Sequence, residues 1–182
     1  MYTDSYKLLQ EQYHIACPEY GCSSSKWATS IIDLAKQFGI KTILDYGCGK
    51  GLLRTLGDSY DVTLFDPFVE EFKQRPKDNY QLVICTDVME HTEPQFTNEI
   101  ISDIFYYSNY LVFFNIAVTP AVKTLPDGRN THINLKSINE WTKILLKYFN
   151  LINVSKQFNE KGTYEALNFL GIKFGIDLRK NV

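Results

Sequence analysis

Four side chains that can bind a cation or move a proton are expected to meet at one edge of a sheet. Asp87, Glu90 and His91 follow an apolar segment predicted to be a strand, and their spacing places them on one face if the chain turns helically there. His132 lies in the loop after the next predicted strand, which leaves from the same edge. Carboxylates combined with imidazoles suit Mg²⁺, Mn²⁺ or Fe²⁺ better than a structural zinc ion. The sequence therefore predicts a divalent-cation site; the alternative is that Glu90 and His91 only cap and pack a helix.

The loop that carries His132 also carries a planar cation. Residues 126–128 are Pro-Asp-Gly, a strong turn signal. The guanidinium of Arg129 presents a fixed pair of donors to a carboxylate or a phosphate. We interpret Arg129 as the residue that orients an anionic acceptor, and His132 and His91 as the reactive imidazoles. The alternative is a surface turn in which Arg129 is solvated.

A glycine turn, Asp45-Tyr46-Gly47-Cys48-Gly49-Lys50-Gly51, ends another apolar segment and precedes a predicted helix. Such a turn brings bare backbone to the carboxyl edge of a sheet, where ligands commonly bind. A phosphate-binding loop requires Ser or Thr after the lysine, but Gly51 follows Lys50. The dinucleotide pattern Gly-x-Gly-x-x-Gly places its third glycine one residue later than this turn does. The remaining cofactor is S-adenosylmethionine (SAM), and the alternative is a turn without any ligand.

The segment from Ile43 to Gly51 resembles the first motif of class I SAM-dependent methyltransferases. The resemblance implies that Asp45 lies near the methionine ammonium, and that Gly47 and Gly49 let the methionine and ribose lie against backbone. It also implies that Asp66, at the end of the next strand, accepts hydrogen bonds from the two ribose hydroxyls, as a carboxylate can. The other residues expected in the cofactor site are Cys48, Pro67 and Asp87.

The acid-x-x-Glu-His pattern from Asp87 to His91 is similar to a motif of metal-dependent members of this family. These members are the ubiquinone-pathway O-methyltransferases and the methyltransferases that act on the 3′-terminal 2′-hydroxyl of small RNAs. The resemblance to the second group implies that a later histidine, here His132, completes the cation site. Asp87 stands where those proteins have Glu, and its shorter side chain makes it the most doubtful ligand.

Alternating strands and helices predict a Rossmann-like α/β fold, with a mostly parallel sheet and helices on both faces. The segments 151–158 and 164–174 are expected to add an antiparallel C-terminal hairpin around residues 159–162. Strands are expected at 40–46, 62–66, 80–86 and 110–116, and helices at 23–38, 52–57, 92–107 and 137–149.

The predicted sheet is shortened between its second strand and Tyr80. Only residues 67–79 lie in this gap, where the resembled family usually fits a helix and a further strand. The missing strand would be followed by the acid that binds the adenine. The adenine contacts are therefore unassigned, and Phe68 and Thr86 are the candidates to supply them.

Length and composition indicate one domain spanning residues 1–182. The aromatic side chains of the N-terminal segment, residues 1–22, suggest a lid over the acceptor, and the alternative is that they simply dock onto the sheet. The net charge of −2 provides no global field that would gather nucleic acid. There is no apolar run of about 18 residues and no secretory signal pattern, so we expect neither a membrane span nor export. The four cysteines form no Cys-x-x-Cys pair, which favours reduced thiols and a cytoplasmic protein.

The expected function is SAM-dependent methylation of an oxygen atom on a small or anionic acceptor, assisted by Mg²⁺ or another divalent cation if the cluster binds one. One alternative is a regulatory or accessory module that binds SAM without transferase activity. A second is a methyltransferase acting on RNA or DNA. A third, a nicotinamide-binding oxidoreductase, is disfavoured by the glycine spacing.

Overall fold

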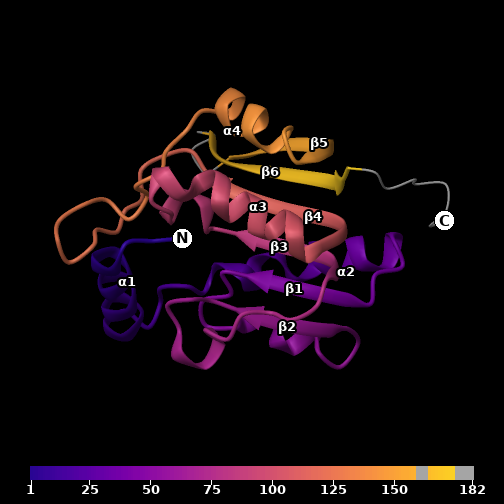
Figure 1. The fold of residues 1–182 in the computed structure, drawn as a ribbon, viewed down its shortest axis with the longest axis horizontal. Coiled ribbons are helices and arrows are strands. Elements are labelled where there is room, and N and C mark those ends of the chain that lie inside the picture. Colours follow the sequence, from indigo (N-terminus) through magenta and orange to yellow (C-terminus); the bar gives the residue numbers. More distant parts are fainter. Residues whose placement is uncertain (159–163, 175–182) are drawn as a thin grey trace.

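A single mixed sheet forms the centre of the molecule. The computed structural model describes residues 1–158 and 164–174. Its six strands lie in the order β2-β1-β3-β4-β6-β5 (Figure 1). The neighbouring pairs among β1 to β4 are parallel, whereas β6 runs antiparallel to β4 and to β5. The strands are β1 (Thr42–Tyr46), β2 (Asp61–Phe65), β3 (Tyr80–Thr86), β4 (Ser108–Ala117), β5 (Phe149–Phe158) and β6 (Tyr164–Lys173). The α/β fold predicted from the sequence is confirmed.

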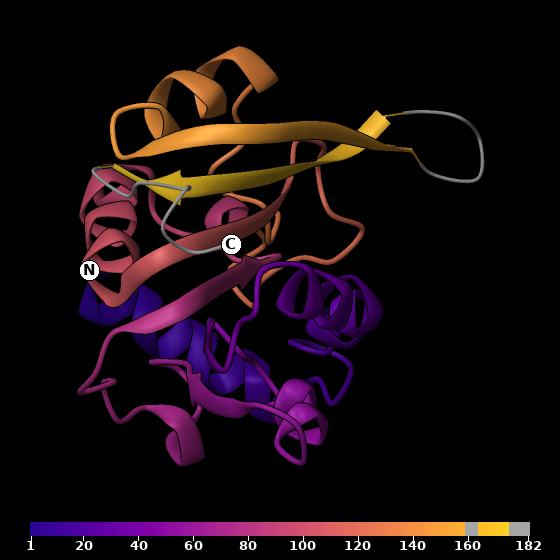
Figure 2. The ribbon, with the colours of Figure 1, turned by 90° about the vertical axis from the view of Figure 1, so that its right-hand side faces the viewer.

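Helices cover both faces of this sheet. They are α1 (Asp4–Ala16), α2 (Ala28–Gln37), α3 (Thr97–Tyr107) and α4 (Ile138–Leu145). One core joins Ile104 of α3 and Trp141 of α4 to β3 and β4, and a second joins Ile31 of α2 to the opposite side of the sheet. Figure 2 shows α2 and α3 on opposite sides of the strands. Two buried faces explain why the central strands are mostly apolar.

Local signals set several of these boundaries. The Ser137 hydroxyl oxygen accepts a hydrogen bond from the backbone N–H of Glu140, and the Glu140 carboxylate accepts one from the backbone N–H of Ser137, so the predicted capping box starts α4. The predicted helix at 137–149 ends earlier, because Phe149 pairs with β6 as the first residue of β5. The short helix at Leu52–Leu56 is a 3-10 helix, and another, Ser23–Trp27, precedes α2.

The helix predicted from Thr92 begins at Thr97 instead. Two short 3-10 turns, Met89–His91 and Pro94–Phe96, lie before it. The Thr92 hydroxyl donates to the carbonyl of Met89, and Phe96 rather than Thr92 stands at the N-cap position of α3. The short 3-10 turn at Met89–His91 carries Glu90 and His91.

The connection from β2 to β3 is short, as predicted. Residues 67–79 contain only the 3-10 turn Glu70–Phe72, and β2 is the outermost strand of the described sheet. The predicted hairpin turn at 159–162 lies outside the described residues. Within the described ranges, no helix is long and apolar enough to cross a membrane.

Candidate active site

A cavity of about 280 Å³ lies where β1, β2 and β3 end. Helix α1, the glycine turn and the residues that follow β2 and β3 line it. The predicted site residues on its wall are Gly47, Cys48, Gly49, Asp66, Pro67, Asp87 and His91. Phe68, one of the two adenine candidates, also lines the cavity, whereas Thr86 is not on its wall. The other predicted residues, Asp45, Glu90, Arg129 and His132, lie outside the wall that the structure describes.

The glycines of the turn are required by the packing of the chain itself. Gly47, Gly49 and Gly51 have φ angles of 81°, 54° and 66°. A Cβ atom on Gly49 would lie 2.2 Å from the carbonyl oxygen of Gly21, and one on Gly47 would lie 2.4 Å from a methyl group of Val88. The sequence suggested that a ligand needs these glycines. The structure shows that the close packing of neighbouring chain segments already requires them.

Two buried acids lie beside the turn. Asp45 is 1% exposed, and neither of its carboxylate oxygens has a hydrogen-bond partner among the described residues. Burial, and then the charge of Asp66, raise the pKa of Asp45 to about 7. Asp66 accepts hydrogen bonds from the backbone N–H groups of Gly49 and Phe68, each at 2.9 Å and on a different oxygen. Each oxygen of Asp66 therefore keeps one lone pair for a further donor.

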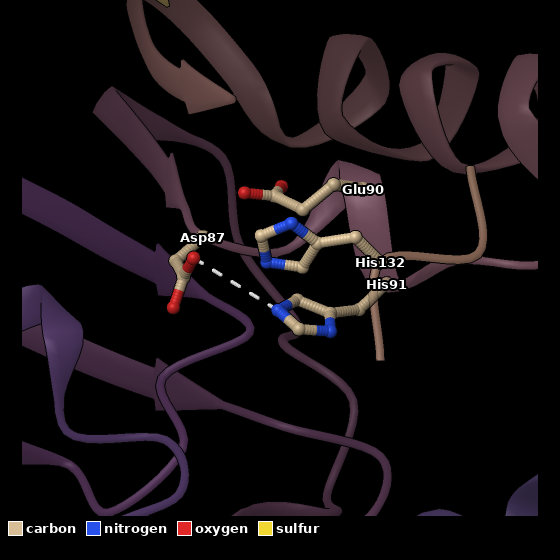
Figure 3. Close-up of side chains that lie close together, drawn as sticks. All are labelled: Asp87, Glu90, His91 and His132. Carbon is tan, nitrogen blue, oxygen red and sulfur yellow. Dashed lines mark ion pairs between the residues drawn. The ribbon is translucent and has the colours of Figure 1, made fainter. Parts of the chain in front are cut away.

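The four residues predicted to form the cation site do come together. One potential ligand atom from each of Asp87, Glu90, His91 and His132 lies within 4.8 Å of those of the others. Figure 3 shows the two imidazoles and the Glu90 carboxylate gathered beside Asp87, with the ion pair between Asp87 and His91 dashed. Nε2 of His91 lies 3.9 Å from Oδ1 of Asp87. The left-handed backbone of Asp87, with φ at 58°, turns the chain at the end of β3.

Backbone carbonyls fix how both imidazoles are presented. Nδ1 of His91 lies 2.9 Å from the carbonyl oxygen of Thr131, and Nδ1 of His132 lies 2.6 Å from that of Thr119. A carbonyl oxygen can only accept, so each Nδ1 carries the proton in these bonds. In the neutral imidazole, each Nε2 is then left with a free lone pair.

Burial and mutual charge set the protonation of the acids and imidazoles in this cluster. Burial, and then the charge of Asp87, raise the pKa of Glu90 to about 8. Burial opposes ionisation of Asp87, but the hydrogen bond and charge of His91 outweigh it and lower the pKa of that carboxyl. Burial likewise opposes the charged form of His91, yet Asp87 raises its pKa overall. Burial lowers the pKa of His132.

The loop between β4 and α4 carries His132 and the two backbone carbonyls that bind the imidazoles. Asn130 stabilises this loop. Its side chain accepts hydrogen bonds from the backbone N–H groups of Ala121 and His132 and donates to the carbonyl of Ala121. Arg129 lies at the exposed tip, where Nε is 2.7 Å from a carboxylate oxygen of Asp127. Sequence reasoning singled out Arg129 and missed Asn130, although an asparagine in a turn commonly bonds to nearby backbone.

Helix α1 also reaches the cluster, through contacts that the sequence did not predict. Tyr6 donates from its hydroxyl to the carbonyl of His91, and Gln10 donates to the Tyr6 oxygen at 2.6 Å. Tyr20 donates to Gln10 at 3.0 Å, and its hydroxyl lies 3.3 Å from Nδ1 of His91. Polar residues at i and i+4 on a helix are the local signal for the Tyr6–Gln10 pair, but nothing local indicates their partner His91.

Comparison with known proteins agrees with this geometry. The family described as "Methyltransferase domain" matches residues 19–156. No curated protein matches the sequence. The chain therefore belongs to the methyltransferase domain family, and it is a class I SAM-dependent methyltransferase.

Solved structures share the fold at low sequence identity. The 1,6-didemethyltoxoflavin-N1-methyltransferase of Burkholderia thailandensis, bound to S-adenosylhomocysteine (SAH), is 14% identical with a TM-score of 0.68, covering 93% of this chain and 89% of its own. The N-methyltransferase NodS of Bradyrhizobium japonicum, also bound to SAH, is 10% identical with a TM-score of 0.67, covering 94% and 100%. The magnesium protoporphyrin IX methyltransferase of Synechocystis, bound to SAM, is 16% identical with a TM-score of 0.60, covering 81% and 78%.

Proposed function

We propose that this chain binds SAM in the cavity beside the glycine turn and methylates an oxygen atom of a small or anionic acceptor. We further propose that a divalent cation held by Asp87, Glu90, His91 and His132 assists this reaction. The convergence of these four side chains next to the cavity is the observation that carries the proposal. The segment 1–22 is proposed to act as a lid, since Tyr6 and Gln10 of α1 line the cavity.

The residues around the glycine turn fit the cofactor. Asp45 has a buried carboxylate without a partner, which suits the ammonium of the methionine moiety. Asp66 lines the cavity and keeps a free lone pair on each oxygen for the ribose hydroxyls. Phe68, next to Pro67, adds an aromatic ring to the wall, which suits the adenine. A sulfonium methyl group is already activated, so the chain's main task is to align the acceptor with it.

The chemistry of the cluster formed by Asp87, Glu90, His91 and His132 likewise fits a divalent cation. Metal-binding histidines commonly donate their second ring N–H to a carbonyl, as His91 and His132 do here. Oε1 of Glu90 accepts from the backbone N–H of Ala117, while the buried Oε2 has no partner among the described residues. A bound divalent cation would lower the pKa of an acceptor hydroxyl. Nε2 of His132, whose pKa is lowered, is also suited to accept a proton directly, and Nε2 of His91 can do so when that ring is neutral.

Direct binding tests the cation site. Mn²⁺ and Mg²⁺ binding would be measured by titration calorimetry on protein purified without a histidine tag and treated with EDTA. Glu90→Gln and His132→Ala should each weaken Mn²⁺ binding by about tenfold or more, as loss of a ligand does, while SAH affinity changes little. Glu99→Gln, an exposed substitution in α3, is the matched control and should change neither. Absence of Mn²⁺ and Mg²⁺ binding to the unaltered protein would remove the cation from the proposal.

The acceptor is tested by transfer from SAM carrying a ¹³C-labelled methyl group. Small-molecule, RNA and DNA fractions of a cell extract serve as acceptors, and label is expected in the small-molecule fraction. The ¹³C chemical shift of the product then distinguishes O-methyl from N-methyl. Two of the similar structures are N-methyltransferases, and an N-methyl product would contradict the choice of oxygen.

Label in the RNA or DNA fraction would contradict the proposal that the acceptor is a small molecule. SAM binding without transfer to any fraction would favour the regulatory module. The cytoplasmic location expected from the sequence stays a prediction.

A further inference from the structure

Two polar side chains on the cavity wall are buried without partners. Nδ1 of His14, near the end of α1, and Oγ of Ser24, in the 3-10 helix before α2, make no hydrogen bond within the described chain. His14 is 8% exposed and Ser24 is 4% exposed, and both line the cavity. A buried polar atom without a partner destabilises the folded chain, because it has lost its hydrogen bonds to water without replacement. Two such atoms on one cavity wall indicate that a ligand supplies the missing partner.

Both side chains lie near the glycine turn. A Cβ atom on Gly21 would lie 2.9 Å from Cε1 of His14 and 2.9 Å from the Cα atom of Gly49, so Gly21 contacts both residues. Lys50 continues this contact, because its backbone N–H donates to the carbonyl of Gly21 and its ammonium donates to that of His14. Ser24 follows three residues after Gly21. The unpartnered atoms therefore belong to the end of the cavity beside the glycine turn.

The chemistry of this end suits an anion. An imidazole N–H and a hydroxyl are donors, and the ammonium of Lys50 adds positive charge beside them. Burial, and then the charges of Lys50 and His91, lower the pKa of His14 to about 4.

Asp45, at the start of the same turn, offers the opposite chemistry. Its unpartnered carboxylate suits a cationic group. An anion site and a cation site at one turn match the two charged groups of an α-amino acid. We propose that His14 and Ser24 bind the α-carboxylate of the methionine moiety of SAM, an inference that rests on the proposed cofactor site.

This assignment makes α1 part of the cofactor site. The helix is held at its start by Glu93, whose carboxylate accepts hydrogen bonds from the backbone N–H and the hydroxyl of Thr3 at 2.7 and 3.0 Å. It is held at its end by Lys50, which donates to the carbonyl of His14 at 2.6 Å. A carboxylate bound by His14 would add a third link, directly between α1 and the cofactor.

The test compares SAH with its decarboxylated analogue, which keeps the amine and lacks only the carboxylate. The unaltered protein should bind SAH at least tenfold more tightly than the analogue. Ser24→Ala and His14→Ala should each weaken SAH binding roughly tenfold, the usual effect of losing one hydrogen bond to a charged group, and leave analogue binding within about twofold. His14→Gln, which keeps a donor, should restore part of the SAH affinity.

Ser25→Ala is the matched control, because the Ser25 hydroxyl donates to the carbonyl of Cys22. It should change the affinity for neither ligand. Thermal melting of each variant checks that the fold is retained. Equal binding of SAH and analogue by the unaltered protein would overturn the inference, as would equal losses for both ligands in the His14 and Ser24 variants. If the unaltered protein binds neither SAH nor SAM, the proposed cofactor site itself is wrong.

Discussion

Gly49→Ala tests whether the glycine turn is fixed by its contact with the N-terminal segment. Its φ of 54° strains an alanine by about 1–2 kcal/mol wherever the residue lies. The added Cβ would also lie 2.2 Å from the carbonyl oxygen of Gly21, so the two segments must separate. Separation breaks the backbone bond from Lys50 to Gly21, worth about 1 kcal/mol, and the ammonium bond from Lys50 to His14, worth about 1.5–3 kcal/mol.

Gly39→Ala is the matched control for this substitution. Gly39 has a similar φ of 64°, but a Cβ atom there would meet nothing within 4 Å. We expect Gly39→Ala to lower the free energy of unfolding by about 1–2 kcal/mol, and Gly49→Ala by about 3.5–6 kcal/mol. Urea unfolding followed by tryptophan fluorescence measures both losses, and SAH affinity should fall only for Gly49→Ala. Equal losses of stability in the two variants would refute the reasoning, because strain alone would then explain them.

Three further predictions concern charge, packing and capping. Asp45 must ionise to bind an ammonium, and its pKa is about 7, so SAH affinity should rise by up to tenfold per pH unit from about pH 5 to about 7. Asp45→Asn should abolish this rise in calorimetry across that range. Trp141 is fully buried, and Trp141→Ala should lower the free energy of unfolding by about 3–5 kcal/mol in urea. Ser137→Ala removes the cap of α4 and should cost about 1 kcal/mol in the same assay.

Much of the fold could be predicted because its signals are local. The strand Tyr80–Thr86 has the predicted boundaries, since an apolar run with defined ends is visible within the segment itself. The cap at Ser137 was equally visible. The start of α3 at Thr97 was not visible in the sequence, because a residue distant in the sequence stabilises the turns before it. Asn134 donates to the carbonyl of Met89 and to the hydroxyls of Thr92 and Thr97, and no local pattern reveals those bonds.

Part of the candidate site could also be predicted from the sequence, and part of it could not. Residues at the carboxyl ends of parallel strands must share an edge of the sheet, so the grouping of Asp87, Glu90 and His91 with Asp66 could be expected from topology. The aromatic N-terminal segment suggested a lid, but the contacts that α1 makes could not be predicted. Its place depends on close contacts between residues far apart in the sequence, such as Tyr6 with His91. Spacing within a segment carries no information about such pairs.

The position of α1 has a kinetic consequence. The helix touches the glycine turn at one end through the carbonyl of His14 and reaches the histidine cluster through Tyr6. Under the proposed assignments, one rigid element thus contacts both the cofactor side and the acceptor side of the cavity. Cofactor exchange requires it to move, and acceptor binding requires it in place. The reaction should therefore follow an ordered sequence in which SAM enters first and SAH leaves last, with the opening rate of α1 as the upper limit on turnover.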